Sequence, residues 1–194
     1  MPTRLPLSTA IAAACGFSQA AVASEGLPRC APMELPVAAV GAAPEQYQIF
    51  CANEVDACDL TGARVLDWTE ALQDTLVRIN DVVNREIEKV SDWERTGLMD
   101  SWDFPFACQG DCEDIALEKR RRLVDEGLPG AAFTLATAFH ETKLFPHAVL
   151  LAETSRGTFV LDDLSDGAPC WDALPYLYTR RERPDGLWTR FQLP

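Results

Sequence analysis

Apolar residues recur every three or four positions between residues 67 and 90, which is the clearest periodic pattern in the chain. Such spacing places the apolar side chains along one face of an α-helix. Asp67, with Glu70 three residues later, has the form of a capping box, which marks a helix start. We therefore expect an amphipathic helix over residues 67–90 with a buried stripe formed by Leu72, Leu76, Ile79, Val83, Ile87 and Val90.

A second helix is predicted to begin at Asp111, whose side chain can cap it, and to run to about Glu126. Gly127 and Pro129 follow in the order that is usual at the end of a helix. This helix carries the segment QGDCED at its start, so a cysteine, Cys112, lies in its first turn between acidic neighbours.

Beyond residue 130 the apolar period changes from helical spacing to two, as in strands. Alternation is visible over residues 133–139, 147–153 and 158–161, and the sequence TSRGT between the last two predicts a hairpin turn. Two helices followed by an antiparallel meander of at least three strands indicate an α+β fold rather than alternating βαβ units.

The first 23 residues have the pattern of a secretory signal peptide. Arg4 supplies the positive end, a run of apolar and small residues follows, and the sequence AVA closes the segment. The apolar run is too short to cross a bilayer. The alternative is a disordered or tethered N-terminus. Residues 24–43, rich in proline and alanine, are expected to form a linker or irregular arm, and residues 44–194 the folded domain.

Composition and charge limit the classes of partner that the chain is expected to bind. Hydrophobic residues make up 47% of the chain and charged residues 24%, which are globular values. The formal net charge of −13 becomes −14 once the single arginine of the signal segment is removed. Such a surface repels nucleic acid and anionic lipid, and it suits divalent cations. We expect no nucleic-acid partner and no membrane insertion after signal cleavage.

Six cysteines remain after signal removal, and in an oxidising compartment three disulfides are the simplest expectation. Cys51 and Cys58 are the best pair, since they close the segment FCANEVDACD, which is expected to be a loop. If Cys112 is free, one of three others must stay unpaired: Cys30, Cys108 or Cys170.

Position makes Cys112 a candidate nucleophile, because unpaired N–H groups and the positive end of the dipole at a helix N-terminus stabilise a thiolate. The chain has two histidines. His147 begins the apolar strand HAVLLAE and can face the helix start, whereas His140, in FHETKLF, is expected to be exposed in a loop. Asp162, in FVLDDL, can pair with His147 across the hairpin and orient its ring.

Each residue also has an ordinary structural explanation. Cys112 could belong to a disulfide, His147 could be a satisfied core histidine, and Asp162 and Asp163 could end a strand as turn residues. The order cysteine, histidine, aspartate on helix, strand and strand favours catalysis and is that of papain-like and transglutaminase-like enzymes. The N–H of Cys112 would give one oxyanion donor, and Gln109 and Trp102 are candidates for a second.

Three blocks, GDCEDIALEKRRRL, PHAVLLAET and GTFVLDDL, resemble the signatures of the bacterial transglutaminase-like cysteine proteinases, the LapG-like periplasmic group. INDVVN, DSWDFP and the tail YLYTRRERPDGLW resemble that family too, so the likeness runs from about Phe50 to the end. The chain departs from the family at Ile115, where tyrosine is usual, and at Asp163, where asparagine is frequent. The second departure leaves open which aspartate orients His147.

The resemblance implies a transglutaminase-like, papain-like core in which the nucleophile at a helix N-terminus packs on an antiparallel sheet. In that family, acids beside the nucleophile bind calcium; Asp111 and Glu113 match those positions, and Asp114 is a further possible ligand. Carboxylate oxygens are the ligands that Ca²⁺ prefers. A bound cation would also reverse the effect of these acids on the thiolate. The alternative is a set of ordinary helix-start acids.

The sequence therefore predicts an exported, calcium-dependent cysteine endopeptidase with Cys112, His147 and Asp162 as its triad. The resemblance implies a surface adhesin as substrate and an inner-membrane receptor as regulator. Two other classes stay open: another acyl-transfer enzyme, such as an amidase or a transglutaminase, on the same triad, and a non-catalytic, disulfide-stapled calcium-binding module.

Overall fold

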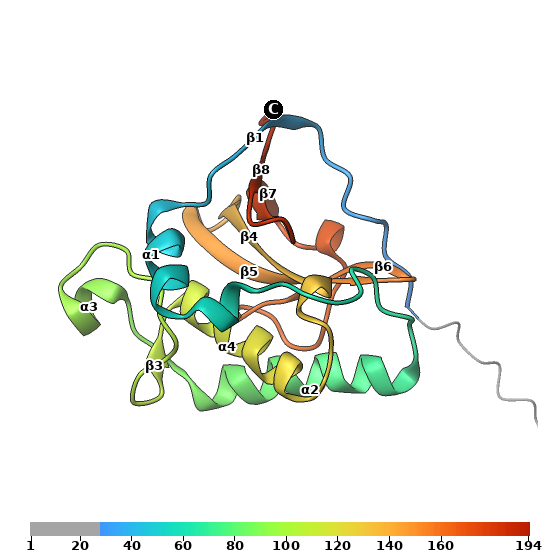
Figure 1. Ribbon diagram of the computed structural model, residues 1–194, viewed down its shortest axis with the longest axis horizontal. Helices are drawn as coiled ribbons and strands as arrows, with labels where there is room; N and C mark the ends of the chain where they lie inside the picture. Colours follow the sequence, from blue (N-terminus) through green and yellow to red (C-terminus); the bar gives the residue numbers. More distant parts are fainter. Residues whose placement is uncertain (1–27) are drawn as a thin grey trace, which may run out of the picture.

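A six-stranded antiparallel sheet, covered on one face by helices, forms the centre of the computed structural model, which describes residues 28–194 (Figure 1). The strands lie in the order β1-β8-β7-β4-β5-β6. Their bounds are β1 (Val37–Gly41), β4 (Phe133–His140), β5 (Phe145–Thr154), β6 (Gly157–Leu161), β7 (Tyr176–Glu182) and β8 (Trp188–Phe191). The prediction of an α+β fold with an antiparallel meander is confirmed.

The helices are α1 (Glu45–Asn53), α2 (Glu70–Glu86), α3 (Asp92–Thr96) and α4 (Cys112–Asp125). A small parallel pair, β2 (Glu88–Lys89) and β3 (Gln109–Gly110), joins the end of α2 to the start of α4. Short 3₁₀ helices span Val55–Cys58, Gly130–Ala132 and Trp171–Ala173. Within the described region, no helix has the length and apolar character needed to cross a membrane.

Helix α2 starts three residues later than predicted. Its cap is Thr69, whose hydroxyl accepts the Leu72 N–H at 3.0 Å, so the prediction of an Asp67 cap is wrong. The preceding residues are held extended, because Leu66 forms a bridge to Thr154 at the β5–β6 hairpin. The predicted apolar stripe is buried from Leu72 to Ile87, while Val90 lies beyond the helix and is half-buried.

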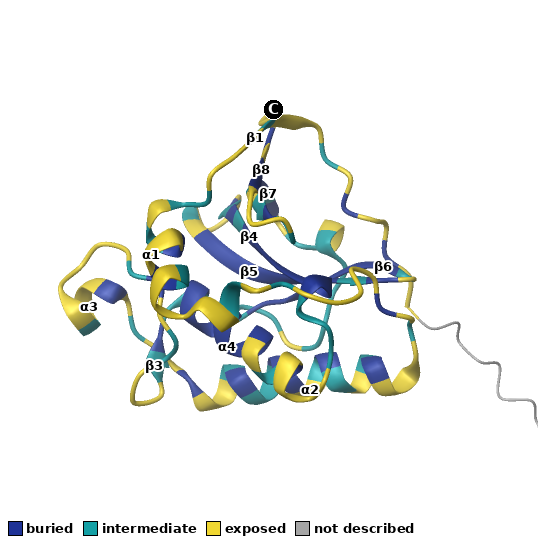
Figure 2. Ribbon diagram, viewed as in Figure 1, coloured by how far each residue is buried: buried dark blue, intermediate teal, exposed yellow. Residues whose placement is uncertain are grey.

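The bounds of helix α4 agree with the prediction, with Asp111 at the N-cap position and Glu126 at the C-cap, but the Asp111 side chain makes no capping hydrogen bond, so that part of the prediction is wrong. Gly127 then adopts a left-handed conformation, φ 87°, which glycine tolerates best. The helix packs between β5 and α2, and much of it is buried (Figure 2). Its apolar residues join the larger of two cores. This burial fixes the position of the first turn, and with it Cys112, against the sheet.

The predicted strands and the hairpin are also confirmed. Gly157 closes the β5–β6 turn with φ 99° and lies so close to the N-terminal segment that a Cβ there would be 2.1 Å from the Cys30 carbonyl oxygen. The expectation for His140 is wrong. This histidine is the last residue of β4, only 4% exposed, and its ring packs against Phe145 and Tyr176.

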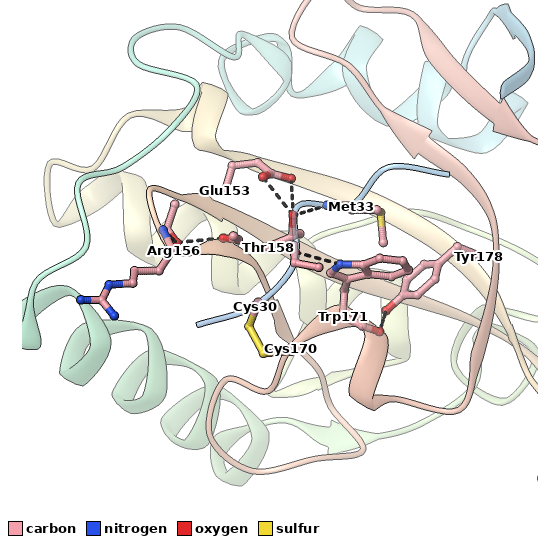
Figure 3. The surroundings of a disulfide bond; sticks show 11 residues. Cys30, Met33, Glu153, Arg156, Thr158, Cys170, Trp171 and Tyr178 are labelled. Atoms are coloured by element: carbon pink, nitrogen blue, oxygen red, sulfur yellow. Dashed lines mark hydrogen bonds between the residues drawn. A yellow bond between two sulfur atoms is a disulfide. The ribbon is translucent and has the colours of Figure 1, made fainter. Parts of the chain in front are cut away.

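The arm predicted over residues 24–43 is part of the domain where it is described. Residues 37–41 form β1 on the sheet edge, since β1 pairs with β8. Upstream, Met33 donates its N–H to Thr158 Oγ1 at 2.8 Å, and Cys30 forms a disulfide with Cys170 (Figure 3). Met33 also covers the sheet face opposite the helices, so the boundary at residue 44 is too late. The signal peptide predicted over residues 1–23 lies outside the described residues.

The second disulfide joins Cys51 and Cys58, as predicted, although the pair links α1 to a 3₁₀ helix rather than closing a loop. Cys108 and Cys112 are free in the described region. Disulfide bonding therefore accounts for four cysteines and leaves the thiol at the start of α4 available for chemistry.

Candidate active site

Cys112 and His147 open onto the same cleft, which has a volume of about 610 Å³. Cys112 comes from the first residue of α4 and His147 from near the start of β5, two elements that pack together. The rest of the lining comes from the segment after α3 and from three strands, including Met99, Trp102, Ala138, Phe139, Thr179 and Arg180. A peptide entering this cleft would therefore meet both the thiol and the imidazole.

The imidazole of His147 is held by two carboxylates. Its Nε2 lies 2.8 Å from Asp162 Oδ1 and 3.3 Å from Asp163 Oδ1, and all three side chains are buried. No hydrogen bond to Nδ1 is found among the described residues, so this nitrogen is free to accept a proton. The structure thus brings together His147 and Asp162, the pair that sequence reasoning placed across the hairpin.

Asp162 is fixed by further groups that sequence reasoning missed. Tyr176 donates its hydroxyl to Asp162 Oδ2, and the Leu164 N–H donates to Oδ1 at 3.1 Å. Asn84, on α2, donates its side-chain amide to the Asp162 carbonyl at 2.8 Å. Burial would raise the pKa of Asp162, but the hydrogen bonds from His147 and Tyr176 outweigh it and lower the pKa to about 2. Asp162 is therefore ionised at any working pH.

Asp163 has a different environment. Lys89 forms an ion pair with Asp163 Oδ2 at 2.7 Å and also bonds to the Asp163 carbonyl. Asp162 is closer to the imidazole and receives more hydrogen bonds, so the geometry favours Asp162 as the orienting acid.

A cluster of three carboxylates lies beside the thiol, which contacts one of them, Glu113. Oxygens of Asp92, Asp111 and Glu113 lie within 4.8 Å of one another, and Asp111 Oδ1 is buried without a hydrogen-bond partner in the described region. Burial and the charge of Asp92 raise the pKa of Asp111 to about 6. Burial and the charge of Asp111 raise the pKa of Glu113 to about 9. These oxygens suit a hard divalent cation, which would relieve their repulsion.

Asp114, the further possible ligand, points elsewhere. Its carboxylate accepts the Asp103 N–H at 2.8 Å and pairs with Arg95 at 2.9 Å, so it supports the segment after α3. Asp92 takes the third place in the cluster by the position of its oxygens, although it also pairs with Arg95 at 2.8 Å and accepts the Ser101 N–H. In the sequence it is only a first-turn acid of a short helix. Its capping box, formed by Ser91 and Glu94, gave no sign of a ligand role.

The thiol itself is turned toward this cluster. Cys112 Sγ lies 3.0 Å from Glu113 Oε2, and no hydrogen bond joins it to His147 among the described residues. Burial, followed by the charge of Glu113, raises the pKa of Cys112 well above its usual value. The thiol therefore donates to Glu113 and holds its proton more tightly than an ordinary cysteine does.

Of the two candidates for a second oxyanion donor, only one lines the cleft. Gln109 donates its side-chain amide to Glu88 at 3.0 Å, away from the cleft, whereas Trp102 lines the cleft. The Gln109 side chain is therefore engaged elsewhere.

A thiol at a helix N-terminus, sharing a cleft with a histidine–aspartate pair, is the arrangement of a cysteine peptidase. The sequence matches the family of bacterial transglutaminase-like cysteine proteinases over residues 37–193. The chain belongs to this family, as its sequence blocks predicted, and is a cysteine peptidase.

The fold is similar to that of LapG from Legionella pneumophila. The calcium-bound LapG structure has 22% identity and a TM-score of 0.54, with 78% of this chain and 84% of that chain covered. The EGTA-treated LapG structure has 24% identity and a TM-score of 0.52, with 76% and 78% covered. At this identity the likeness concerns the fold. A comparison with curated proteins found no match.

Proposed function

We propose that this cysteine peptidase is an exported, calcium-dependent endopeptidase that cleaves a periplasmic or cell-surface protein such as an adhesin. Its triad is Cys112, His147 and Asp162. The observation that supports the triad best is the cleft shared by Cys112 and His147, in which the imidazole Nε2 lies 2.8 Å from Asp162.

The chemistry follows from this arrangement. His147 Nδ1 takes the thiol proton, and Cys112 Sγ attacks the carbonyl carbon of a peptide bond. The N–H of Cys112 donates to the oxygen that becomes negative. The imidazolium returns the proton to the leaving amine as the C–N bond breaks, which leaves a thioester. Water, activated by His147, then hydrolyses the thioester and frees the acid and the thiol.

A calcium ion would be held by Asp92, Asp111 and Glu113, whose oxygens already converge. When bound, the ion supplies positive charge that lowers the proton affinity of these carboxylates and of the nearby thiol. Glu113 would then be occupied as a ligand and could no longer hold the Cys112 proton. One of the similar LapG structures is calcium-bound, which supports this choice of cation.

The proposals of export, of an adhesin-like substrate and of a receptor rest on other observations. The signal pattern of residues 1–23 and the two disulfides suit the periplasm. The family resemblance supports an adhesin-like substrate and an inner-membrane receptor that restrains the enzyme. A comparison of cell-surface protein N-termini from cells with the native chain and cells with Cys112→Ala would identify the substrate. If cells with the native chain and cells with Cys112→Ala have the same surface-protein N-termini, a cell-surface substrate is excluded.

The triad is tested on the substrate so identified. Cys112→Ala and His147→Ala should each lower the cleavage rate by more than about 1,000-fold with unchanged folding. Asp162→Asn should lower the rate more than Asp163→Asn, because only Asp162 has the full set of supporting hydrogen bonds. The reverse order would assign the orienting role to Asp163. Normal cleavage by Cys112→Ala would remove the nucleophile assignment.

Calcium dependence is tested with Glu113→Gln, which keeps the shape of the side chain and removes its charge. Calcium should raise the melting temperature of the native chain more than magnesium does, since Mg²⁺ requires stricter octahedral geometry. Glu113→Gln should lose most of this rise. Asp125→Asn, on the same helix but outside the cluster, is the matched control and should keep it. An equal rise in both variants would exclude Glu113 as a ligand.

A further inference from the structure

Arg180, on β7, is an exposed cation in the cleft that holds Cys112 and His147. Among the described residues that line this cleft, it is the only lysine or arginine. Its guanidinium makes no hydrogen bond or ion pair within the part of the chain that the structure describes. The chain has a formal net charge of −13 and therefore many carboxylates. An arginine that pairs with none of them, in the cleft of the nucleophile, is available to a ligand.

A β-bulge directs Arg180 into the cleft. The pairing of β4 with β7 shifts register after Thr137, which lies opposite Arg180, so that Thr179 is the extra residue. Successive residues of a regular strand point to opposite faces, yet Thr179 and Arg180 both line the cleft. Thr179 Oγ1 lies 2.8 Å from Thr137 Oγ1 and donates to the Thr137 carbonyl at 3.1 Å. Two hydrogen bonds thus hold the bulge that places the arginine.

A second arginine lies beside the first. Arg190, on β8, is the direct cross-strand partner of Arg180, and both residues are exposed. Arg190 also makes no ion pair among the residues that the structure describes. Like charges directly opposite each other destabilise a sheet. The two guanidinium groups can together hold a carboxylate, since each presents its N–H donors in a planar fork. A bound carboxylate would also relieve their repulsion.

The position of Arg180 in the sheet sets which part of a substrate it meets. One row of cross-strand partners runs from Ala148, which follows the base, through Thr137 to Arg180. Neighbouring strands lie about 4.8 Å apart, so Arg180 is roughly 10 Å from the β5 end of this row. An extended peptide rises about 3.3 Å per residue. Arg180 therefore reaches a substrate side chain about two to four residues from the scissile bond.

We propose that Arg180, supported by Arg190, binds an aspartate or glutamate side chain of the peptide substrate, about two to four residues from the scissile bond. The proposal rests on the proposed function, because it places the scissile bond at Cys112. The acidic surface of the chain repels an acidic peptide elsewhere. This pair of arginines would therefore select the position at which an acidic segment is cleaved.

The test is cleavage of a peptide library, made from a digested proteome, by the native chain in the presence of Ca²⁺. Mass spectrometry of the products gives the residues around each cut. Aspartate and glutamate should be enriched at one position near the cut. Arg180→Met should lower kcat/KM for a peptide with glutamate at that position by roughly 5- to 10-fold, and should leave its glutamine analogue within about two-fold. Arg180→Glu should shift the preference to lysine and arginine at the same position.

Arg64→Met is the matched control, because it removes the same charge from an exposed arginine outside the cleft. It should keep the acidic preference. Arg190→Met should weaken the preference less than Arg180→Met does, and it should not lower the melting temperature, since it relieves the like-charge pair. An identical preference in the native chain and Arg180→Met would overturn the proposal. Normal cleavage by Cys112→Ala would instead refute the proposed function, so the two failures are distinguishable.

A binding measurement does not depend on cleavage. Capped tetraglutamate is titrated into the Cys112→Ala protein, with capped tetraglutamine as the neutral control. Tetraglutamate should shift the side-chain Nε–H signal of Arg180 in NMR spectra, and tetraglutamine should not. The affinity for tetraglutamate should fall roughly 5- to 10-fold when Arg180→Met is added, and should stay unchanged when Arg64→Met is added. Equal binding of the two peptides by the Cys112→Ala protein would overturn the proposal.

Discussion

Tyr176→Phe removes a single oxygen that supports the proposed triad. The Tyr176 hydroxyl donates to Asp162 Oδ2, a buried carboxylate whose other oxygen faces His147. A hydrogen bond to a charged group is worth roughly 1.5–3 kcal/mol, and a bond between neutral groups about 0.5–1.5 kcal/mol. We expect Tyr176→Phe to lower the free energy of unfolding by about 2 kcal/mol at neutral pH.

Part of this loss should depend on pH. The folded pKa of Asp162 is about 2, against about 3.9 in an unfolded chain, which corresponds to about 2.6 kcal/mol of stability. Because the folded pKa is depressed, this stability is present above pH 4 and is lost as the pH falls toward 2. His147 and Tyr176 are the two main hydrogen-bond donors that depress it, so roughly half, about 1.3 kcal/mol, is assigned to Tyr176.

The assay is urea unfolding of the native chain and the variant at pH 7 and pH 3. Tyr178→Phe is the matched control on the same strand, since the Tyr178 hydroxyl donates to the Trp171 carbonyl at 3.2 Å, a neutral acceptor. Tyr176→Phe should lose more stability than the control at pH 7, and the difference should shrink at pH 3. Equal losses in both variants, or a Tyr176→Phe loss that is the same at both pH values, would refute the reasoning.

Two further predictions concern the N-terminal segment. By loop-closure entropy, removing the Cys30–Cys170 disulfide, which spans 140 residues, should lower the free energy of unfolding by about 5 kcal/mol. Removing the Cys51–Cys58 disulfide, which spans 7 residues, should lower it by about 2 kcal/mol. Urea unfolding that reversed this order would contradict the estimate. Gly157→Ala should lower the free energy of unfolding by more than about 1 kcal/mol, and by more than Gly186→Ala does. Both glycines have positive φ, but only Gly157 lies against a carbonyl group, that of Cys30. Equal melting temperatures of the two variants would exclude an effect of that contact.

The parts that the sequence predicted correctly depend on short-range signals. Helix α4, the β5–β6 hairpin and their strands are marked by period, capping residues and turn residues within a few positions. Because His147 and Asp162 flank one hairpin, local pattern was enough to place them together. The third member of the proposed triad, Cys112, starts a helix that must bury its apolar face on the same sheet.

The features that were missed depend on contacts between distant segments. Asn84 occupies a helix position where polarity alone suggests exposure, yet it is half-buried and its amide binds the Asp162 carbonyl, 78 residues further along the chain. The asparagines of INDVVN next to an apolar stripe were the available signal. His140 was expected to be exposed because its neighbours are polar, yet aromatic rings from β5 and β7 cover it. The proline-rich arm gave no sign of the disulfide that anchors it.

The acid loop, residues 162–170, shows how distant contacts support the proposed triad. Asp162 and Asp163 begin a segment without regular structure that ends at Cys170. Asn84 and Lys89 bind the carbonyl oxygens at its start, and the disulfide to Cys30 holds its end. A loop fixed at both ends loses little freedom when it orients an imidazole, so the cost of ordering the carboxylates is met during folding and not in each turnover. Substitutions in α2 should therefore affect the rate of peptide cleavage even though no side chain of α2 lines the cleft.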